Sequence, residues 1–307
     1  MSLVELALRK LQDTRRAGNR DLRRETPLGA IREVAAVDVP VAEGEPASAR
    51  RRIIQLDRPA LVQSGFLPPD HKQQQIGDQF RHVKRPLLAA ALGRGVEPAP
   101  HGRMIMLASS LPGEGKTFVS VNLALSMSLE RDIAVVLVDA DVAKPHISRL
   151  FGIDAEPGLL EALQDESLDI ESLILPTDIP KFSVLPAGKP TETATELLAS
   201  RRMQAIVARL EASRDRTRVV IFDSPPLLLT AESRVLAQPM GQIVLVVQAG
   251  RTPQQAVLDA IACLGPNKSV ALLLNQSESV SESGYYYRDV VYGDYARYGA
   301  PVSGTDG

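Results

Sequence analysis

The sequence predicts an α/β fold in which a mostly parallel β-sheet is wrapped by helices. After Pro98, short β-rich runs alternate with helical patterns, as in parallel sheets whose strands are joined by helices. Most of these runs are continuous in Val, Ile and Leu, which is typical of strands buried on both faces. The chain has 307 residues, of which 44% are hydrophobic and 23% charged, so it can bury such a core and carry a smaller module besides.

The individual elements follow from periodicity. The predicted strands are residues 104–108, 134–138, 182–185, 219–222, 243–247 and 270–274, and the predicted helices between them are 116–129, 194–213 and 253–264. Two helical patterns precede the sheet. In residues 2–16, Ser2 and Glu5 have the spacing of a capping box, and in residues 73–92 Pro86 predicts a bend or a break.

Composition divides the chain into three segments. Residues 1–60 hold a basic N-terminal helix and a linker, because residues 35–50 are small, proline-containing and without periodicity. Residues 61–276 form the predicted α/β domain, and residues 277–307, rich in Ser, Gly and Tyr, form a predicted flexible tail.

Charge is distributed unevenly along the chain. Residues 1–100 hold 17 Lys and Arg against 12 Asp and Glu, whereas the remainder holds 18 against 25. The basic N-terminal part is therefore expected to meet an anionic membrane surface or an acidic partner, unless it is an ordinary solvated helix.

A single cysteine, Cys263, excludes an internal disulfide and multi-cysteine metal sites. No uncharged stretch reaches the roughly 20 apolar residues of a membrane span, and the N-terminus lacks the apolar centre of a signal peptide.

A glycine-rich loop, SSLPGEGKT at residues 109–117, lies between the first predicted strand and the next helix. In such a loop the amides and the positive helix end converge on phosphates, while a lysine adds a point charge. Lys116 is expected to reach the β- and γ-phosphates, and Thr117 to place its hydroxyl on Mg²⁺. Ser110 stands where the strict motif has its first glycine. The predicted phosphate-binding residues are Pro112, Gly113, Glu114, Gly115, Lys116, Thr117 and Phe118.

Polar side chains also leave the ends of three other predicted strands. Asp139 and Asp141 follow one strand, Asp223 follows another, and Asn275 follows the last. Carboxylates at the carboxyl ends of parallel strands project into the crevice where α/β sheets bind ligands, and Mg²⁺ prefers oxygen ligands. Each aspartate alone could be a helix cap. Together with the loop lysine and threonine, the aspartates predict a site for a nucleoside triphosphate and its metal. Asn275 is expected either to hydrogen-bond the nucleotide base or to cap a turn.

These residues carry a family resemblance. The segments SSLPGEGKT, VVLVDADVAKP and VVIFDSPPLL resemble the Walker A, Walker A′ and Walker B motifs of the bacterial tyrosine kinases, and the C-terminal tyrosines resemble that family's autophosphorylation cluster. The basic N-terminal helix and the segments HVKRPLL, LPAG and TELLAS are similar to the tyrosine autokinases of exosortase and exopolysaccharide loci. Leu111 stands where partitioning ATPases have a signature lysine, and one cysteine cannot hold the cluster of nitrogenase iron proteins.

The resemblance implies a fold of the P-loop NTPase type and an activity. The chain would be a non-specific protein-tyrosine kinase that uses ATP and Mg²⁺, phosphorylates itself, and regulates exopolysaccharide polymerisation, chain length and export. Lys116, Asp139 and Asp141 would be catalytic, and Thr117, Asp139 and Asp223 would hold the metal, with the choice of base between Asp139 and Asp141 left open. The phosphoacceptors would be Tyr285, Tyr286, Tyr287, Tyr292, Tyr295 and Tyr298.

The resemblance also implies partners. The oligomerisation motif of the family corresponds to Asp78, Arg81 and Lys84, which would pair across an interface in a homo-oligomer such as a ring, although a solvated charged face is the alternative. The expected partners are further copies of the chain, an integral membrane chain-length determinant or polysaccharide co-polymerase and a counteracting tyrosine phosphatase, with no nucleic acid. The expected location is cytoplasmic, at the inner face of the cell membrane through a partner.

Two other functional classes remain open from the sequence. The chain would then be either a P-loop assembly ATPase or switch of the partitioning type, whose tail binds partners without phosphorylation, or an ATP-binding scaffold without turnover. The intact loop lysine and the three aspartates argue against the scaffold.

Overall fold

The computed structural model describes residues 52–265 and 268–277. The chain divides into two compact units, Met1–Asn275 and Gln276–Gly307, so the division falls one residue before the predicted tail. All the elements described below belong to the first unit. The predicted helix at residues 2–16, the linker at 35–50 and the six tyrosines lie outside the described residues.

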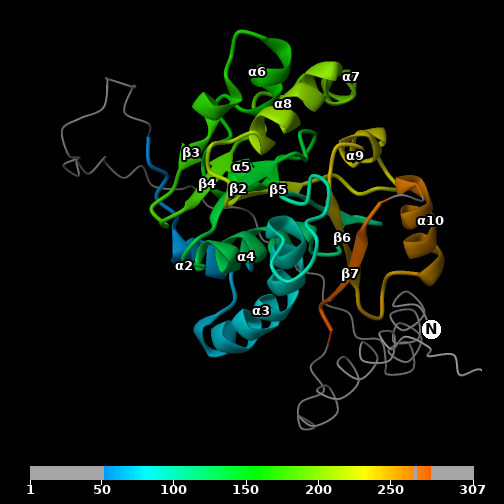
Figure 1. The fold of residues 1–307 in the computed structure, drawn as a ribbon. Helices are drawn as coiled ribbons and strands as arrows, with labels where there is room; N and C mark the ends of the chain where they lie inside the picture. The colour runs from blue at the N-terminus through cyan, green and yellow to red at the C-terminus, as the bar shows by residue number, and fades with distance from the viewer. Residues whose placement is uncertain (1–51, 266–267, 278–307) are drawn as a thin grey trace, which may run out of the picture. The chain divides into compact units, whose positions relative to one another are not determined.

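A seven-stranded sheet lies at the centre of this unit, in the order β3-β4-β2-β5-β1-β6-β7 (Figure 1). The strands are β1 Met104–Ser109, β2 Ala134–Asp139, β3 Leu175–Pro176, β4 Phe182–Leu185, β5 Arg218–Asp223, β6 Gln242–Gln248 and β7 Val270–Asn275. Every neighbouring pair is parallel except β3 and β4. The predicted α/β fold with a mostly parallel sheet is therefore confirmed.

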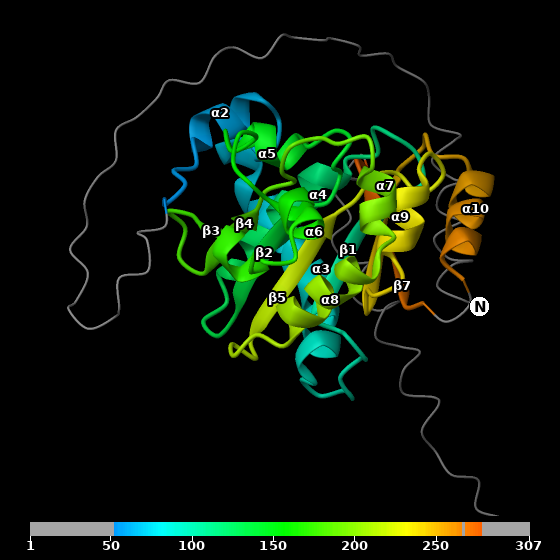
Figure 2. The same cartoon turned by 90° about the horizontal axis from the view of Figure 1, so that it is seen from above.

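Helices cover both faces of the sheet (Figures 1 and 2). They are α2 Arg58–Gln63, α3 Asp70–Leu92, α4 Lys116–Ser128, α5 His146–Leu150, α6 Leu159–Gln164, the 3₁₀ helix η1 Ile170–Leu173, α7 Ala194–Leu198, α8 Arg201–Glu211, α9 Ala231–Leu236 and α10 Gln254–Leu264.

The alternation of side chains along β1 divides the core into two layers. Met104 and Met106 belong to a cluster with buried residues of α6 to α10, whereas Ile105 and Leu107 belong to a cluster with buried residues of α2 to α5. All six residues of β1 are buried. This two-sided burial explains why the strands read as continuous apolar runs in the sequence.

Two helices differ from the prediction. The helix expected over 194–213 is divided, because the side chain of Ser200 accepts a hydrogen bond from the Met203 amide and caps a new helix, α8. The helix expected near 73–92 runs without interruption from Asp70 to Leu92, with Pro86 inside it.

The compact unit begins before residue 61. Ile54 and Leu56 are buried in the core, the Ile54 amide donates to the Pro176 carbonyl, and Asp57 caps α2 by accepting from the Ala60 amide. Residues 54–57, which the prediction left in the N-terminal segment 1–60, are thus part of the packed domain. Across residues 52–265 and 268–277, no helix combines the length and apolar composition needed to cross a membrane.

Candidate active site

The predicted site residues lie along one edge of the sheet. The glycine-rich loop follows β1, Asp139 ends β2, Asp223 ends β5, and Asn275 ends β7. Strands β2, β5 and β1 are neighbours, and Asp139 lies opposite Asp223 in the β2–β5 register. Because parallel strands run in one direction, their carboxyl ends bring these side chains together.

The loop conformation requires two of its glycines. Gly113 and Gly115 have φ angles of 82° and 85°, in the left-handed region that residues with a Cβ rarely adopt. Gly115 is also the N-cap of α4, so the unpaired amides of the first helical turn face the loop. The loop and the positive end of α4 thus form the geometry that anionic phosphate groups bind.

Asp223 is the centre of a hydrogen-bond network in this structure. Its side chain is fully buried and accepts bonds from Lys116 Nζ at 3.0 Å, Thr117 Oγ1 at 2.8 Å and Ser120 Oγ at 2.8 Å. Ser120 is not among the predicted site residues, although it lies four residues after Lys116 on the same face of α4. Its single hydroxyl proton is shared between Asp223 and the carbonyl of that lysine. The network fixes the lysine and the threonine at the amino end of α4.

Asp139 is held through one oxygen only. The amide and the hydroxyl of Ser148 both donate to Oδ2 of Asp139, each at 2.7 Å. Oδ1 is buried and has no hydrogen-bond partner among the described residues. Burial raises the pKa of Asp139 to about 7, with smaller contributions in the same direction from Asp223 and Asp141.

Asp141 lies in the same electrostatic field. It is 6% exposed and accepts from the Lys144 amide at 3.2 Å. Burial raises its pKa, and the positive charge of Lys116 opposes that rise. The carboxyl groups of Asp139, Asp141 and Asp223 thus lie near Lys116 at this edge of the sheet. When ionised, they carry more negative charge than the lysine neutralises, and a divalent cation would balance that excess.

The donor set fits Mg²⁺. Thr117 Oγ1, the Asp223 carboxylate and the unpartnered Oδ1 of Asp139 are hard oxygen donors, which is the chemistry that Mg²⁺ prefers. Among the described residues, no group of three or more His, Cys, Asp or Glu side chains could hold a metal ion. Mg²⁺ in phosphoryl-transfer sites is usually bound by one or two carboxylates together with substrate phosphates and water, so a bound nucleotide would complete this site.

Hydrogen bonds of Glu114 and Asn275 connect the loop to the carboxyl ends of β6 and β7. Glu114 is 2% exposed, and its carboxylate accepts from the Leu111 amide at 2.9 Å and from the Thr252 hydroxyl. Burial raises its pKa, against the lowering effect of these hydrogen bonds. The amide nitrogen of Asn275 donates to the Glu114 carbonyl at 2.9 Å, so in this structure Asn275 contacts the loop itself.

Phe118 belongs to the helix rather than to the loop surface. Its ring packs against the ring of Phe80 on α3, with centroids 6.4 Å apart. A contribution of Phe118 to nucleotide binding would therefore come from its main chain at the start of α4.

The predicted oligomerisation residues occupy two different environments. Asp78 and Arg81 form an ion pair of 2.5 Å on α3, with side chains 49% and 58% exposed. Lys84 is 5% exposed; its Nζ donates to the Ser126 carbonyl at 2.7 Å and pairs with Glu130 at 2.7 Å. Lys84 thus joins α3 to α4 within one subunit, and only the first two residues of the motif are on the surface.

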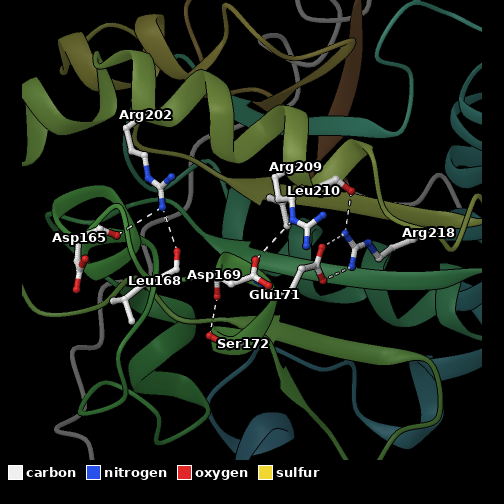
Figure 3. Close-up of polar contacts among 9 residues, drawn as sticks. All are labelled: Asp165, Leu168, Asp169, Glu171, Ser172, Arg202, Arg209, Leu210 and Arg218. Atoms are coloured by element: carbon white, nitrogen blue, oxygen red, sulfur yellow. Dashed lines mark hydrogen bonds and ion pairs between the residues drawn. The ribbon is translucent and has the colours of Figure 1, made fainter. Parts of the chain in front are cut away.

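Two hollows of about 330 and 290 Å³ lie along α8, and none of the predicted site residues lines either. Figure 3 shows the surroundings of the larger one. Arg202 donates to the carbonyls of Asp165 and Leu168, while Arg218 forms a bidentate pair with Glu171 at 2.7 and 2.6 Å (Figure 3). Arg209 pairs with Asp169 at 3.6 Å, so the three arginines shown are bound to protein acceptors (Figure 3).

Comparison with known proteins shows the family to which the chain belongs. Residues 102–257 match the AAA domain family. The tyrosine-protein kinase CpsD of Streptococcus agalactiae serotype Ia is 30% identical over 185 residues, which cover 59% of this chain and 78% of the relative. The chain belongs to the bacterial tyrosine-protein kinases. Membership of this family also assigns nucleotide binding to the chain.

Other bacterial tyrosine-protein kinases show the same likeness. YwqD of Bacillus subtilis is 27% identical over 234 residues, covering 75% of this chain and 94% of the relative. The solved kinase domain of Escherichia coli tyrosine kinase ETK is 26% identical, with a TM-score of 0.54 over 68% of this chain and 80% of that chain.

Some relatives are much longer than the chain. The succinoglycan biosynthesis transport protein ExoP of Rhizobium meliloti is 31% identical over 224 residues, or 71% of this chain, but the match covers only 27% of ExoP. The chain thus spans about a quarter of that relative's length.

Proposed function

We propose that the chain is an ATP- and Mg²⁺-dependent tyrosine autokinase that phosphorylates tyrosines of its own C-terminal segment and thereby regulates exopolysaccharide polymerisation, chain length and export. The observation that carries the proposal is the convergence of Lys116, Thr117 and three aspartates at the amino end of α4. The similarity to the tyrosine-protein kinases YwqD and CpsD supports the reaction, and the similarity to the succinoglycan biosynthesis transport protein ExoP supports the connection with a polysaccharide.

Lys116 and the loop would bind the phosphates. The lysine is 7% exposed and already paired with Asp223, so its charge is held at the edge where the loop amides converge. Residues 112–118 would surround the β- and γ-phosphates, and Asn275 would hydrogen-bond the base. These contacts supply positioning and charge stabilisation, which account for most of the catalysis of phosphoryl transfer.

Thr117, Asp139 and Asp223 would hold Mg²⁺. When bound, the metal would neutralise charge on the β- and γ-phosphate oxygens. In the transfer, a new bond forms between the tyrosine oxygen and the γ-phosphorus, while the bond to the bridging oxygen of ADP breaks and ADP leaves with the electron pair. The tyrosine proton would pass to Asp139 or Asp141, which lie at the same edge of the sheet as Lys116, and burial raises the pKa of both carboxyl groups in the metal-free chain.

The tyrosines of the second unit are the proposed acceptors: Tyr285, Tyr286, Tyr287, Tyr292, Tyr295 and Tyr298. Each phosphate would add a charge of about −1.5 to −2. Several phosphates on one segment would repel one another, and this repulsion supports a role for phosphorylation in loosening an assembly.

The assembly would consist of copies of the chain and a membrane partner. Asp78 and Arg81 are exposed on α3 and available to an interface in a homo-oligomer. An integral membrane co-polymerase would recruit the kinase from the cytoplasm to the inner face of the membrane through the basic residues of segment 1–60, and a tyrosine phosphatase would reverse the modification. The predicted domain of residues 61–276, extended at its start by the packed residues 54–57, would then be the kinase domain, and 277–307 the autophosphorylation segment.

A product balance tests the reaction. The purified protein is incubated with ATP and Mg²⁺, and ADP and phosphotyrosine are quantified in the same samples. The proposal predicts that early ADP formation is matched by phosphotyrosine and stops when the acceptors are filled, and that both products are lost in Lys116→Met. Continuous ADP release without phosphotyrosine, also in the presence of a membrane partner's cytosolic segment, would instead establish an assembly ATPase.

A further inference from the structure

We propose that Ser148 is a positioning residue for phosphoryl transfer: it holds Oδ2 of Asp139 so that Oδ1 is presented to the metal and the tyrosine hydroxyl. The proposal rests on the proposed kinase function and assigns a role to a residue that the sequence motifs do not include. Ser148 lies on α5, five residues long, which follows the segment carrying Asp139 and Asp141.

Two donors of Ser148 converge on one oxygen. The main-chain amide and the side-chain hydroxyl each lie 2.7 Å from Oδ2 of Asp139, and both residues are almost completely excluded from solvent, at 1% and 0% exposed. Two hydrogen bonds to one carboxylate oxygen fix the rotation of the group as well as its position. Such bonds to a charged acceptor are among the stronger ones in proteins.

The direction of the serine hydroxyl is fixed as well. The amide of Ala187 lies 3.0 Å from Ser148 Oγ and can only donate, so the hydroxyl accepts this bond and directs its own proton to Asp139. Ala187 belongs to the LPAG segment, residues 185–188, which begins at the last residue of β4. The carbonyl of Ala187 in turn accepts from the Leu160 amide at 3.0 Å, which anchors the segment to α6. A chain of hydrogen bonds therefore connects α6 to Asp139.

The second oxygen of Asp139 provides an independent observation. Oδ1 is buried and has no hydrogen-bond partner in the described part of the chain. Unpaired buried acceptors are rare in native proteins, and a catalytic role or an ion that completes them is among the reasons they persist. A serine that served only to attach α5 to the sheet would not require the other oxygen to remain unpaired.

Ser148→Ala tests the proposal, because it removes the hydroxyl and keeps the main-chain amide. Ser148→Thr restores a hydroxyl at the same position. Ser172→Ala is the matched control: it removes a hydroxyl that donates to the Asp169 carbonyl at an exposed position of η1. All three variants are checked for native thermal unfolding in the full chain.

The first readout separates turnover from binding. Ser148→Ala is expected to lower the kcat for phosphotyrosine formation about tenfold or more, the loss expected when one hydrogen bond to a charged group is removed. The KM for ATP is expected to change less than about threefold, since the phosphate-binding loop is intact. Ser148→Thr is expected to recover most of the kcat, and Ser172→Ala to match the unaltered chain.

The second readout does not depend on turnover. Binding of the non-hydrolysable analogue AMPPNP is measured by calorimetry against Mg²⁺ concentration and again in EDTA. Ser148→Ala is expected to raise the Mg²⁺ concentration needed for half-maximal binding several-fold and to leave binding in EDTA unchanged. If the unaltered chain makes no phosphotyrosine, the kinase proposal fails while this binding experiment still decides the role of Ser148.

Two results would overturn the positioning role. One is a Ser148→Ala protein with unchanged kcat and unchanged Mg²⁺ dependence, because the hydroxyl would then only attach α5 to the sheet. The other is failure of Ser148→Thr to recover either quantity although the variant folds normally, since the loss would then come from packing.

Discussion

Replacing Lys84 by Met is expected to destabilise the subunit and to leave its self-association unchanged. Lys84 lies on α3 but donates to the carbonyl of Ser126 in the last turn of α4. The last four carbonyls of a helix have no partner within it, and a cation there also interacts favourably with the negative end of the helix dipole. Lys84 therefore caps the same helix whose first turn bears the phosphate-binding lysine.

The size of the effect follows from the contacts of the ammonium group. A hydrogen bond from a buried charged donor contributes about 1.5–3 kcal/mol. The pair with Glu130, whose side chain is 39% exposed, adds less than about 1 kcal/mol. Met keeps the apolar stem and avoids the cost of burying a charge, so the net loss is expected to be about 2 kcal/mol, or a fall in Tm of about 4–8 °C.

Calorimetric melting and sedimentation velocity measure the two properties in parallel. Arg81→Met is the matched control for stability, since its guanidinium is exposed and its ion pair in the described part of the chain is with Asp78. This control is expected to shift the Tm by less than about 2 °C. Equal melting of the two variants, or a loss of self-association in Lys84→Met without a fall in Tm, would refute the assignment of Lys84 to the α3–α4 contact.

Three further perturbations address other parts of the domain. Glu171→Ala would leave the 9% exposed Arg218 without its carboxylate partner, and is expected to cost about 1–3 kcal/mol in urea unfolding; an unchanged midpoint would contradict this. Thr252→Val removes the hydroxyl that donates to the buried carboxylate of Glu114, and is expected to weaken AMPPNP binding about three- to tenfold and to cost about 1–3 kcal/mol in urea unfolding; unchanged affinity would show that the loop holds its shape without that bond. In the metal-free protein with EDTA, Asp139 has a pKa of about 7 in the folded state and about 4 in the unfolded state. Between these pH values the unfolded state binds fewer protons than the folded state, so the stability contributed by the protonated group is lost as pH rises. Relative to Asp139→Asn, the unaltered chain should lose up to about 1.4 kcal/mol per pH unit in this window, and parallel pH profiles would contradict the buried environment.

The sheet could be predicted from sequence because its strands are buried on both faces. The six longer strands differ from the predicted runs by at most one residue at either end. The strand β3, the 3₁₀ helix η1 and the short helices α2, α5, α6 and α9 were missed, since segments of two to six residues give no clear period and are held by packing. The break between α7 and α8 depends on the orientation of Ser200, which a helical pattern alone does not reveal.

For the site, the sequence identified groups on neighbouring parallel strands but not those that position them. Asp139 and Asp223 converge because the strand ends share an edge, a consequence of topology. Ser148 and Thr252 reach the site only through tertiary packing, so no local pattern marks them. Lys84 had a signal that was overlooked: it shares its helix face with buried apolar residues three and four positions away, namely Phe80, Leu87 and Leu88.

Intact-mass analysis with peptide mapping after incubation with ATP and Mg²⁺ tests the central claim most directly. The kinase assignment predicts mass steps of one phosphate each, confined to the peptide that carries Tyr285 to Tyr298, and their absence in Lys116→Met and in a variant with all six tyrosines replaced by Phe. Absence of phosphate despite demonstrated ATP binding, even with the cytosolic segment of a candidate membrane partner added, would contradict the assignment.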